Sequence, residues 1–227
     1  MGRDNQPKDR QKARDIHRRA AKREPFDRVL IVCEGEKTEP LYLEEIRREF
    51  RLSTANLQVW PSAMGTDCLQ VVEYAEQLFI HGDRAKAIEP LAFDGVFAVF
   101  DRDDHLGYPQ ALSKAKALNL KHKNYEGEAV SFEAVASVPC FELWLLLHFE
   151  DVLAPVHRND VYQGLRHHLP NYAKGQGGQF ASTRHNLDAA TARATALAGL
   201  TNAFNGHEPY TDVHTLVSTL IKLKDEA

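Results

Sequence analysis

Short apolar runs alternate with amphipathic segments over the first two thirds of the chain. The first run, residues 29–33, is apolar at every position, as strands are when both faces of their sheet are buried. Residues 38–50 follow and carry apolar side chains at helical spacing, with Thr38 as the expected cap and Pro40 in the first turn. This stretch therefore predicts a strand followed by a helix.

The same succession recurs three times farther along the chain. Strands are predicted at residues 57–60, 96–100 and 129–136, and helices at residues 67–79, 109–118 and 140–149. Asp67 is the expected cap of the first of these helices. Short strands that alternate with helices are typical of a parallel sheet covered by helices on both faces. We therefore predict an α/β fold with a parallel sheet of about four strands.

Helical periodicity replaces the strand pattern after residue 151. It covers residues 158–168, 186–204 and 211–224. We expect three parts: a basic N-terminal arm at residues 1–27, an α/β core at residues 28–150, and an α-helical extension at residues 151–227 that packs on the core.

Composition indicates a soluble protein. The longest strongly apolar stretch, around residues 143–147, is far shorter than the ~20 residues that span a bilayer, and no apolar run of a secretory signal follows the basic N-terminal residues. The cysteines Cys33, Cys68 and Cys140 lie in apolar contexts without CxxC or CxxH spacing. We expect a cytoplasmic protein with reduced cysteines, no structural zinc site and no membrane contact.

Charge is distributed unevenly along the chain. Residues 1–28 contain ten Lys/Arg and five Asp/Glu, a balance of +5, whereas the other 199 residues contain eighteen and twenty-seven, a balance of −9. A basic arm can bind nucleic acid by releasing counterions, and it can equally be a solvated helical tail. The tail is favoured because no aromatic residues interleave the basic ones, which Asp4, Asp9 and Asp15 dilute.

Acidic motifs follow two of the predicted strands directly. The first strand runs into Glu34-Gly35-Glu36-Lys37, and the third runs into Asp101-Arg102-Asp103-Asp104. In open α/β sheets, ligands bind at the carboxyl ends of the strands, near the point where strand order reverses. We therefore expect both motifs at the binding edge of the sheet.

Three of these acids are candidate metal ligands. Asp101 and Asp103 are two residues apart, so in an extended chain their side chains point the same way, and Glu34 joins them if the first and third strands are neighbours. Converging carboxylates repel one another, and an oxygen-seeking Mg²⁺ or Mn²⁺ relieves that repulsion. Taken alone, each acid is best interpreted as an ordinary loop or helix-cap residue. Two acidic motifs at equivalent strand ends instead favour a metal site.

Other residues are candidates for supporting roles. Gly35 leaves room for a phosphate, and Lys37 lies just before a predicted helix, where it can pair with a phosphate oxygen. Lys174 in a glycine-rich loop is a further candidate for substrate binding, with a plain surface loop as the alternative. The loop is not a Walker A motif, because no Gly-Lys-Ser/Thr follows. The remaining candidates for substrate contact or support are Arg102, Glu36 and Asp104.

Glu142 and His105 complete the set of candidate site residues. Glu142 interrupts an apolar helix, where an unpaired charge is costly, so it either reaches the acidic site or pairs with an arginine in the core. His105 follows the second acidic motif and is the candidate proton donor among eleven histidines. The histidines show no HxH or HExxH spacing, which disfavours zinc.

Four segments carry a family resemblance. VLIVCEGEKTE at residues 29–39 and VFAVFDRDD at residues 96–104 resemble the Toprim pattern of topoisomerases, primases and OLD-type nucleases. With SVPCFELWLLLHFE at residues 137–150 and PYTDVHTLV at residues 209–217, the arrangement resembles the RloB family of bacterial phage-defence proteins. The resemblance covers roughly residues 26–220.

The resemblance implies a Toprim core in which Glu34, Asp101 and Asp103 bind one or two Mg²⁺ ions and support phosphodiester cleavage. It also implies an AAA or ABC-type ATPase as partner, and DNA, RNA or a specific tRNA as substrate. Unlike topoisomerases, the chain has no evident tyrosine-bearing gate domain, so hydrolysis is expected rather than strand passage.

Two other classes of function, and self-association, stay open. The acids can bind metal in a non-catalytic regulatory module that docks on an ATPase. A phosphoacceptor receiver domain is the weakest alternative, because it needs an acidic pair after its first strand and a lysine after its last. A homo-oligomer is compatible with either leading hypothesis.

Overall fold

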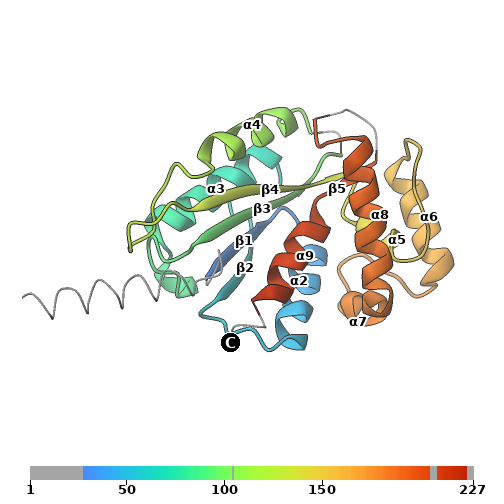
Figure 1. Cartoon of the computed structure of the whole chain (residues 1–227), viewed down its shortest axis with the longest axis horizontal. Coiled ribbons are helices and arrows are strands. Elements are labelled where there is room, and N and C mark those ends of the chain that lie inside the picture. Colours follow the sequence, from blue (N-terminus) through green and yellow to red (C-terminus); the bar gives the residue numbers. More distant parts are fainter. Residues whose placement is uncertain (1–27, 104, 205–208, 224–227) are drawn as a thin grey trace, which may run out of the picture.

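A five-stranded sheet lies at the centre of the computed structural model, which describes residues 28–103, 105–204 and 209–223 (Figure 1). The predicted arm at residues 1–27 and Asp104 lie outside the described residues. The strand order is β2-β1-β3-β4-β5, with β5 antiparallel to β4 and the other pairs parallel. The strands are β1 (Val29–Cys33), β2 (Leu57–Pro61), β3 (Gly95–Asp101), β4 (Ser131–Val138) and β5 (Tyr210–Thr211).

Helices cover both faces of the sheet, which confirms the α/β prediction (Figure 1). One face packs against α3 (Cys68–His81) and α4 (Tyr108–Leu118). The other packs against α2 (Thr38–Glu49), α5 (Glu142–Leu146), α8 (Leu187–Leu200) and α9 (Val213–Lys222). α6 (Arg158–His168) packs on α5 and α7 (Gln179–Thr183) packs on α2, and both add residues to the same hydrophobic core. The short 3₁₀ helices are η1 (Arg84–Lys86) and η2 (Arg184–Asn186).

The central strands are buried on both faces, as the continuous apolar runs predicted. In β1, Val29, Ile31 and Cys33 belong to the core beneath α2 and α5, while Leu30 and Val32 belong to the core beneath α3 and α4. Successive side chains of a strand point to opposite faces, so an apolar run with no polar position requires a helical layer on each side.

Three details of the prediction are wrong. Residues 210–211 form a fifth strand, so the later part of the chain contributes to the sheet and strands do not cease after residue 151. The helix predicted at residues 140–149 is only the five-residue α5. Thr38 does not cap α2; Lys37 stands at the cap position without a side-chain hydrogen bond, and the Thr38 hydroxyl accepts from the Gly175 amide at 3.1 Å.

The topology brings the two acidic motifs together. β1 lies between β2 and β3, with Cys33 opposite Val99, and the Glu34 amide donates to the Val99 carbonyl at 2.8 Å. The chain leaves β1 for β2 on one side and then returns to β3 on the other, so the strand order reverses between β1 and β3. A binding site is expected at this reversal, and both acidic motifs begin there.

Asp67 caps α3 as predicted, because its carboxylate accepts a hydrogen bond from the Leu69 amide at 3.0 Å. We expect Asp67→Ala to lower the free energy of unfolding by about 1 kcal/mol, since the amide loses its acceptor. Asp67→Asn keeps an acceptor oxygen and should retain most of that stability. Urea unfolding of both variants measures the difference; an equal loss in the two would contradict the capping role.

Candidate metal centre

Glu34 links the two acidic motifs directly. Its Oε2 accepts a hydrogen bond from the Asp101 amide at 2.9 Å, and its Oε1 lies 3.1 Å from His105 Nε2. Burial raises the pKa of Glu34, the Asp101 amide and His105 oppose that shift, and the charge of Asp103 adds to it. The first motif, the second motif and the candidate proton donor therefore meet at one place.

Asp101 is the most deeply buried of the predicted ligands, with 5% of its surface exposed. Its pKa lies well above the usual value, first because burial removes water from the carboxylate and then because other acids surround it. The acids that contribute are, in decreasing order, Glu39, Glu142, Glu34 and Asp103. The two largest charge effects thus come from residues outside the predicted triad.

Glu39 was not singled out from the sequence. It lies in the first turn of α2 and is 4% exposed, and its Oε2 has no hydrogen-bond partner among the described residues. Burial, followed by the charge of Glu142, raises its pKa from 4.5 to about 7. A Cβ at position 35 would lie 2.1 Å from Glu39 Oε2, so a larger residue there would displace this carboxylate. The room that Gly35 provides is thus filled by the protein itself.

Glu142 reaches the acidic site rather than an arginine. It is 1% exposed, its Oε1 accepts from the Tyr172 hydroxyl at 2.7 Å, and its Oε2 has no hydrogen-bond partner in the described part of the chain. Its negative charge raises the pKa values of both Asp101 and Glu39. Of the two interpretations left open by the sequence, membership of the acidic site is the one that the contacts favour.

Asp103 lies outside the extended strand β3 and pairs with Arg158. It lies beyond the end of β3 with a φ of 37°, so the same-side spacing of an extended chain does not apply. Its Oδ2 pairs with Arg158 Nη1 at 2.8 Å, while its Oδ1 is buried without a hydrogen-bond partner within the described residues. Burial raises the pKa of Asp103, and Arg158 opposes that shift. Arg158, the first residue of α6, gave no signal in the sequence.

Two lysines meet beside the acids. Lys37 and Lys174 line one pocket of about 230 Å³, together with Gly35, Glu36 and Glu39. Burial alone would lower the pKa of Lys174, but the negative charges of Glu142 and Asp101 hold the pKa above its usual value. The pocket unites two candidates for phosphate binding that are far apart in the sequence.

Arg102 and His105 line a second pocket, of about 260 Å³, on the α4 side. The Arg102 guanidinium lies 6.0 Å from the centre of the Tyr108 ring. Because Arg102 points to the opposite face from Asp101, it is separated from Lys37 and Lys174. The predicted substrate-binding residues are therefore divided between two sides of the acidic site.

The acidic site has the donors that a hard divalent cation needs. Within the described residues, three buried carboxylate oxygens lack a hydrogen bond: Glu39 Oε2, Asp103 Oδ1 and Glu142 Oε2. Buried carboxylates without donors are costly, and Mg²⁺ or Mn²⁺ prefers such oxygen ligands. Among the described residues, one group of three possible metal ligands has its donor atoms within 4.8 Å of one another, namely Glu34, Cys68 and His105. The unpartnered oxygens of Glu39, Asp103 and Glu142 are suited to a hard cation by their chemistry, and they extend the set of acids beyond the predicted triad.

The acids lie at the carboxyl edge of an α/β sheet, beside a topological switch point, which is where open α/β sheets commonly bind ligands. The chain matches the family described as RloB-like protein over residues 29–220, and it belongs to that family. Neither a curated protein nor a solved structure matches the chain. In the part of the chain that the structure describes, no helix has the length and apolarity needed to cross a membrane.

Proposed function

We propose that this RloB-like chain is a Mg²⁺- or Mn²⁺-dependent nuclease of the Toprim type, which hydrolyses phosphodiester bonds of DNA or RNA. We further propose that it acts in phage defence together with an ATPase partner. The observation that supports the chemistry most strongly is the set of carboxylates around Asp101, three of which have a buried oxygen without a hydrogen-bond donor in the described structure. Acids in such numbers fit a site whose charge is balanced by a cation.

The side chains divide into three roles. Glu34, Asp101, Glu39 and Glu142 would hold the ion, which when bound supplies Lewis-acid stabilisation of charge on a phosphate. Lys37 and Lys174 line the adjacent pocket and would bind phosphate oxygens. His105 Nε2, beside Glu34 Oε1, can hold a proton and donate it to a leaving oxygen. Asp103 orders Arg158 at the rim of the site.

A non-catalytic, metal-binding module that docks on an ATPase is the second candidate. One observation favours it: two of the three predicted ligands already have protein partners, Glu34 with His105 and Asp103 with Arg158. A site used only to stabilise the fold needs no free coordination position, whereas a hydrolytic site does.

Cleavage assays separate the two candidates. The full chain, alone and with its ATPase partner, is incubated with labelled DNA and RNA pools in Mg²⁺, Mn²⁺ or EDTA. A nuclease should cleave one pool in either metal, lose cleavage in EDTA, and lose most of it in Asp101→Asn. Asp188→Asn, an exposed acid on α8 that makes the same change of charge, should cleave like the unmodified chain. Intact complex formation without cleavage under every condition would favour the docking module.

A further inference from the structure

The outer edge of β4 has no strand partner at residues 131–136 among the residues that the structure describes. β4 spans residues 131–138, but β5 pairs only with Ser137 and Val138. Within the described residues no other strand pairs with this edge. Open edges present unpaired amide and carbonyl groups and are ready sites for the addition of another strand.

The direction of the backbone groups follows from two contacts. The Phe132 amide donates to Asn119 Oδ1 at 3.1 Å, and the Ala136 carbonyl accepts from the Asp212 amide at 3.0 Å. Both partners lie on the side of β4 away from β3. Because backbone groups alternate in direction along a strand, the amide and carbonyl of Ala134 also point outward. Asn119 and Asp212 thus close the two ends of the edge, and Ala134 lies in the gap between them.

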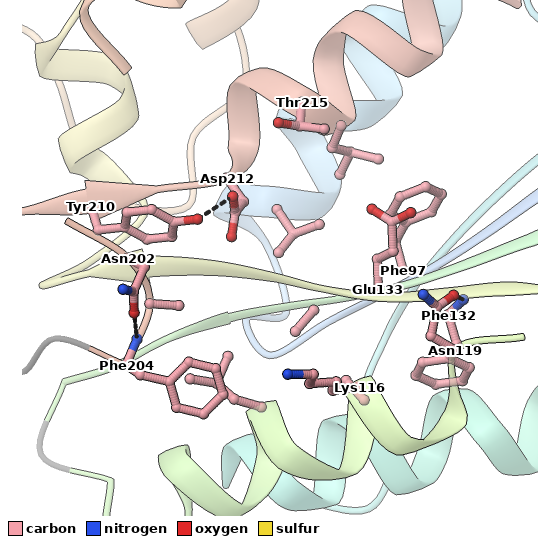
Figure 2. Close-up of a pocket in the computed structure, with 16 residues that line it drawn as sticks. Phe97, Lys116, Asn119, Phe132, Glu133, Asn202, Phe204, Tyr210, Asp212 and Thr215 are labelled. Carbon is pink, nitrogen blue, oxygen red and sulfur yellow. Dashed lines mark hydrogen bonds between the residues drawn. The ribbon is translucent and has the colours of Figure 1, made fainter. Parts of the chain in front are cut away.

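A groove of about 360 Å³ runs along this gap (Figure 2). Figure 2 shows Glu133, Asp212 and Thr215 on the side of β4 that faces α9. Lys116 and Phe204 lie on the α4 side, where Phe204 is 57% exposed. A strand laid along the edge would alternate its side chains between these two sides.

The α9 side of the groove is acidic. Glu133 accepts a hydrogen bond from the Ser131 hydroxyl at 2.7 Å, and Asp212 accepts one from the Tyr210 hydroxyl at 2.6 Å. The pKa of Asp212 is raised to about 6, mainly by burial, and the charge of Glu133 contributes to the increase. The two carboxylates therefore repel each other, and a cationic side chain between them would relieve that repulsion. The α4 side instead offers the Phe204 ring and the aliphatic stem of Lys116.

We propose that the open edge of β4 binds an extended segment of a partner protein, in which cationic side chains facing α9 alternate with apolar side chains facing α4. Main-chain hydrogen bonds at Ala134 supply affinity, and the two sides of the groove supply specificity. The acidic side disfavours nucleic acid as the occupant, because phosphates would meet Glu133 and Asp212. This edge is separate from the acidic metal centre, so the proposed peptide binding does not depend on nuclease activity.

A seven-residue peptide that alternates lysine and valine tests the proposal, with binding to the full chain followed by fluorescence polarisation. We expect Glu133→Gln with Asp212→Asn to weaken binding about tenfold, because two attractive carboxylates are lost. Glu89→Gln with Asp188→Asn, an equal change of charge at exposed positions outside the groove, should bind as the unmodified chain does. Glutamate in place of the peptide lysines should abolish binding.

Backbone pairing is tested by methylating the peptide amides on alternate residues, in two complementary versions. In an added strand only one set of alternate amides faces β4, so one version should lose binding and the other should keep it. Ala134→Pro removes the outward amide of the chain and should also abolish binding, without removing a hydrogen bond to β3.

Four results would overturn the proposal. The first is that the lysine–valine peptide does not bind, and the second is that the two methylated versions bind equally well. The third is that Asp101→Asn loses binding while the groove variants keep it. The fourth is that an oligonucleotide displaces the peptide. Hydrogen exchange provides a fifth test. An Ala134 amide already protected in the chain alone would show that a second copy, or residues 1–27, covers the edge instead.

Discussion

Asp101→Asn should reduce metal-dependent cleavage by on the order of 10³-fold, equivalent to about 4 kcal/mol of transition-state stabilisation. The amide is close in size to the carboxylate but carries no charge and only one oxygen. Asp101 is 5% exposed and is surrounded by other acids, and a bound cation would stabilise its negative charge there. Cleavage rates in Mg²⁺, measured under single-turnover conditions, test the expected loss.

The same substitution should leave the fold intact and make the metal-free protein at least as stable as the unmodified chain. Removing one charge from a buried group of like charges lowers their mutual repulsion. In thermal unfolding, Mg²⁺ should raise the Tm of the unmodified chain and of Asp188→Asn, but not that of Asp101→Asn. A normal Mg²⁺-dependent rise of Tm in Asp101→Asn would remove this residue from the metal site, whatever happened to cleavage.

Stability in EDTA should fall as the pH rises from about 4.5 to about 7. The pKa of Glu39 is raised from 4.5 to about 7 by burial and then by the charge of Glu142. Between these pH values the folded protein holds a proton that the unfolded chain has released, so folding takes up a proton. The stabilising contribution is complete below pH 4.5 and is lost as the pH rises through 7, with a magnitude of about 3 kcal/mol. The raised pKa of Asp101 acts in the same direction.

Urea unfolding at pH 5, 6, 7 and 8, in EDTA and in Mg²⁺, measures this dependence. Glu39→Gln should be more stable than the unmodified chain at pH 8 in EDTA, and the difference between the two should shrink towards pH 5. Glu36→Gln is the matched control, because it changes charge equally at an exposed position three residues away. Mg²⁺ should flatten the dependence in the unmodified chain. A stability difference between Glu39→Gln and the unmodified chain that did not vary with pH would refute the assignment.

The local pattern of apolar and polar residues was sufficient to predict much of the fold. The all-apolar run of β1 required burial on both faces, and the helical periodicity of residues 158–168 matched α6 at both ends. Asp67 was recognised as a cap because capping depends on residues close in the chain. β5 was missed because a two-residue strand has too few positions to show a period, and it forms only through pairing with β4.

Part of the acidic site could also be predicted from local pattern. Glu34 follows β1 directly and Asp101 is the last residue of β3, so the parallel topology alone brings them to one edge. The expectation that Asp103 faces the same way as Asp101 assumed an extended chain, whereas the chain leaves that conformation after β3, where Asp103 has a φ of 37°. No local pattern distinguishes Glu39 from an ordinary acid in the first turn of a helix.

The sequence by itself determined the α/β class, the family and the edge of the sheet at which the acids gather, because these depend on periodicity and on the ends of strands. Only the tertiary structure decided which acids share the site. Glu39 and Glu142 lie 103 positions apart, and each becomes a neighbour of Asp101 only when α2 and α5 pack on the same face of the sheet. Burial then changes their chemistry, since a carboxylate is perturbed by the water it loses and the charges it meets, neither of which local sequence specifies.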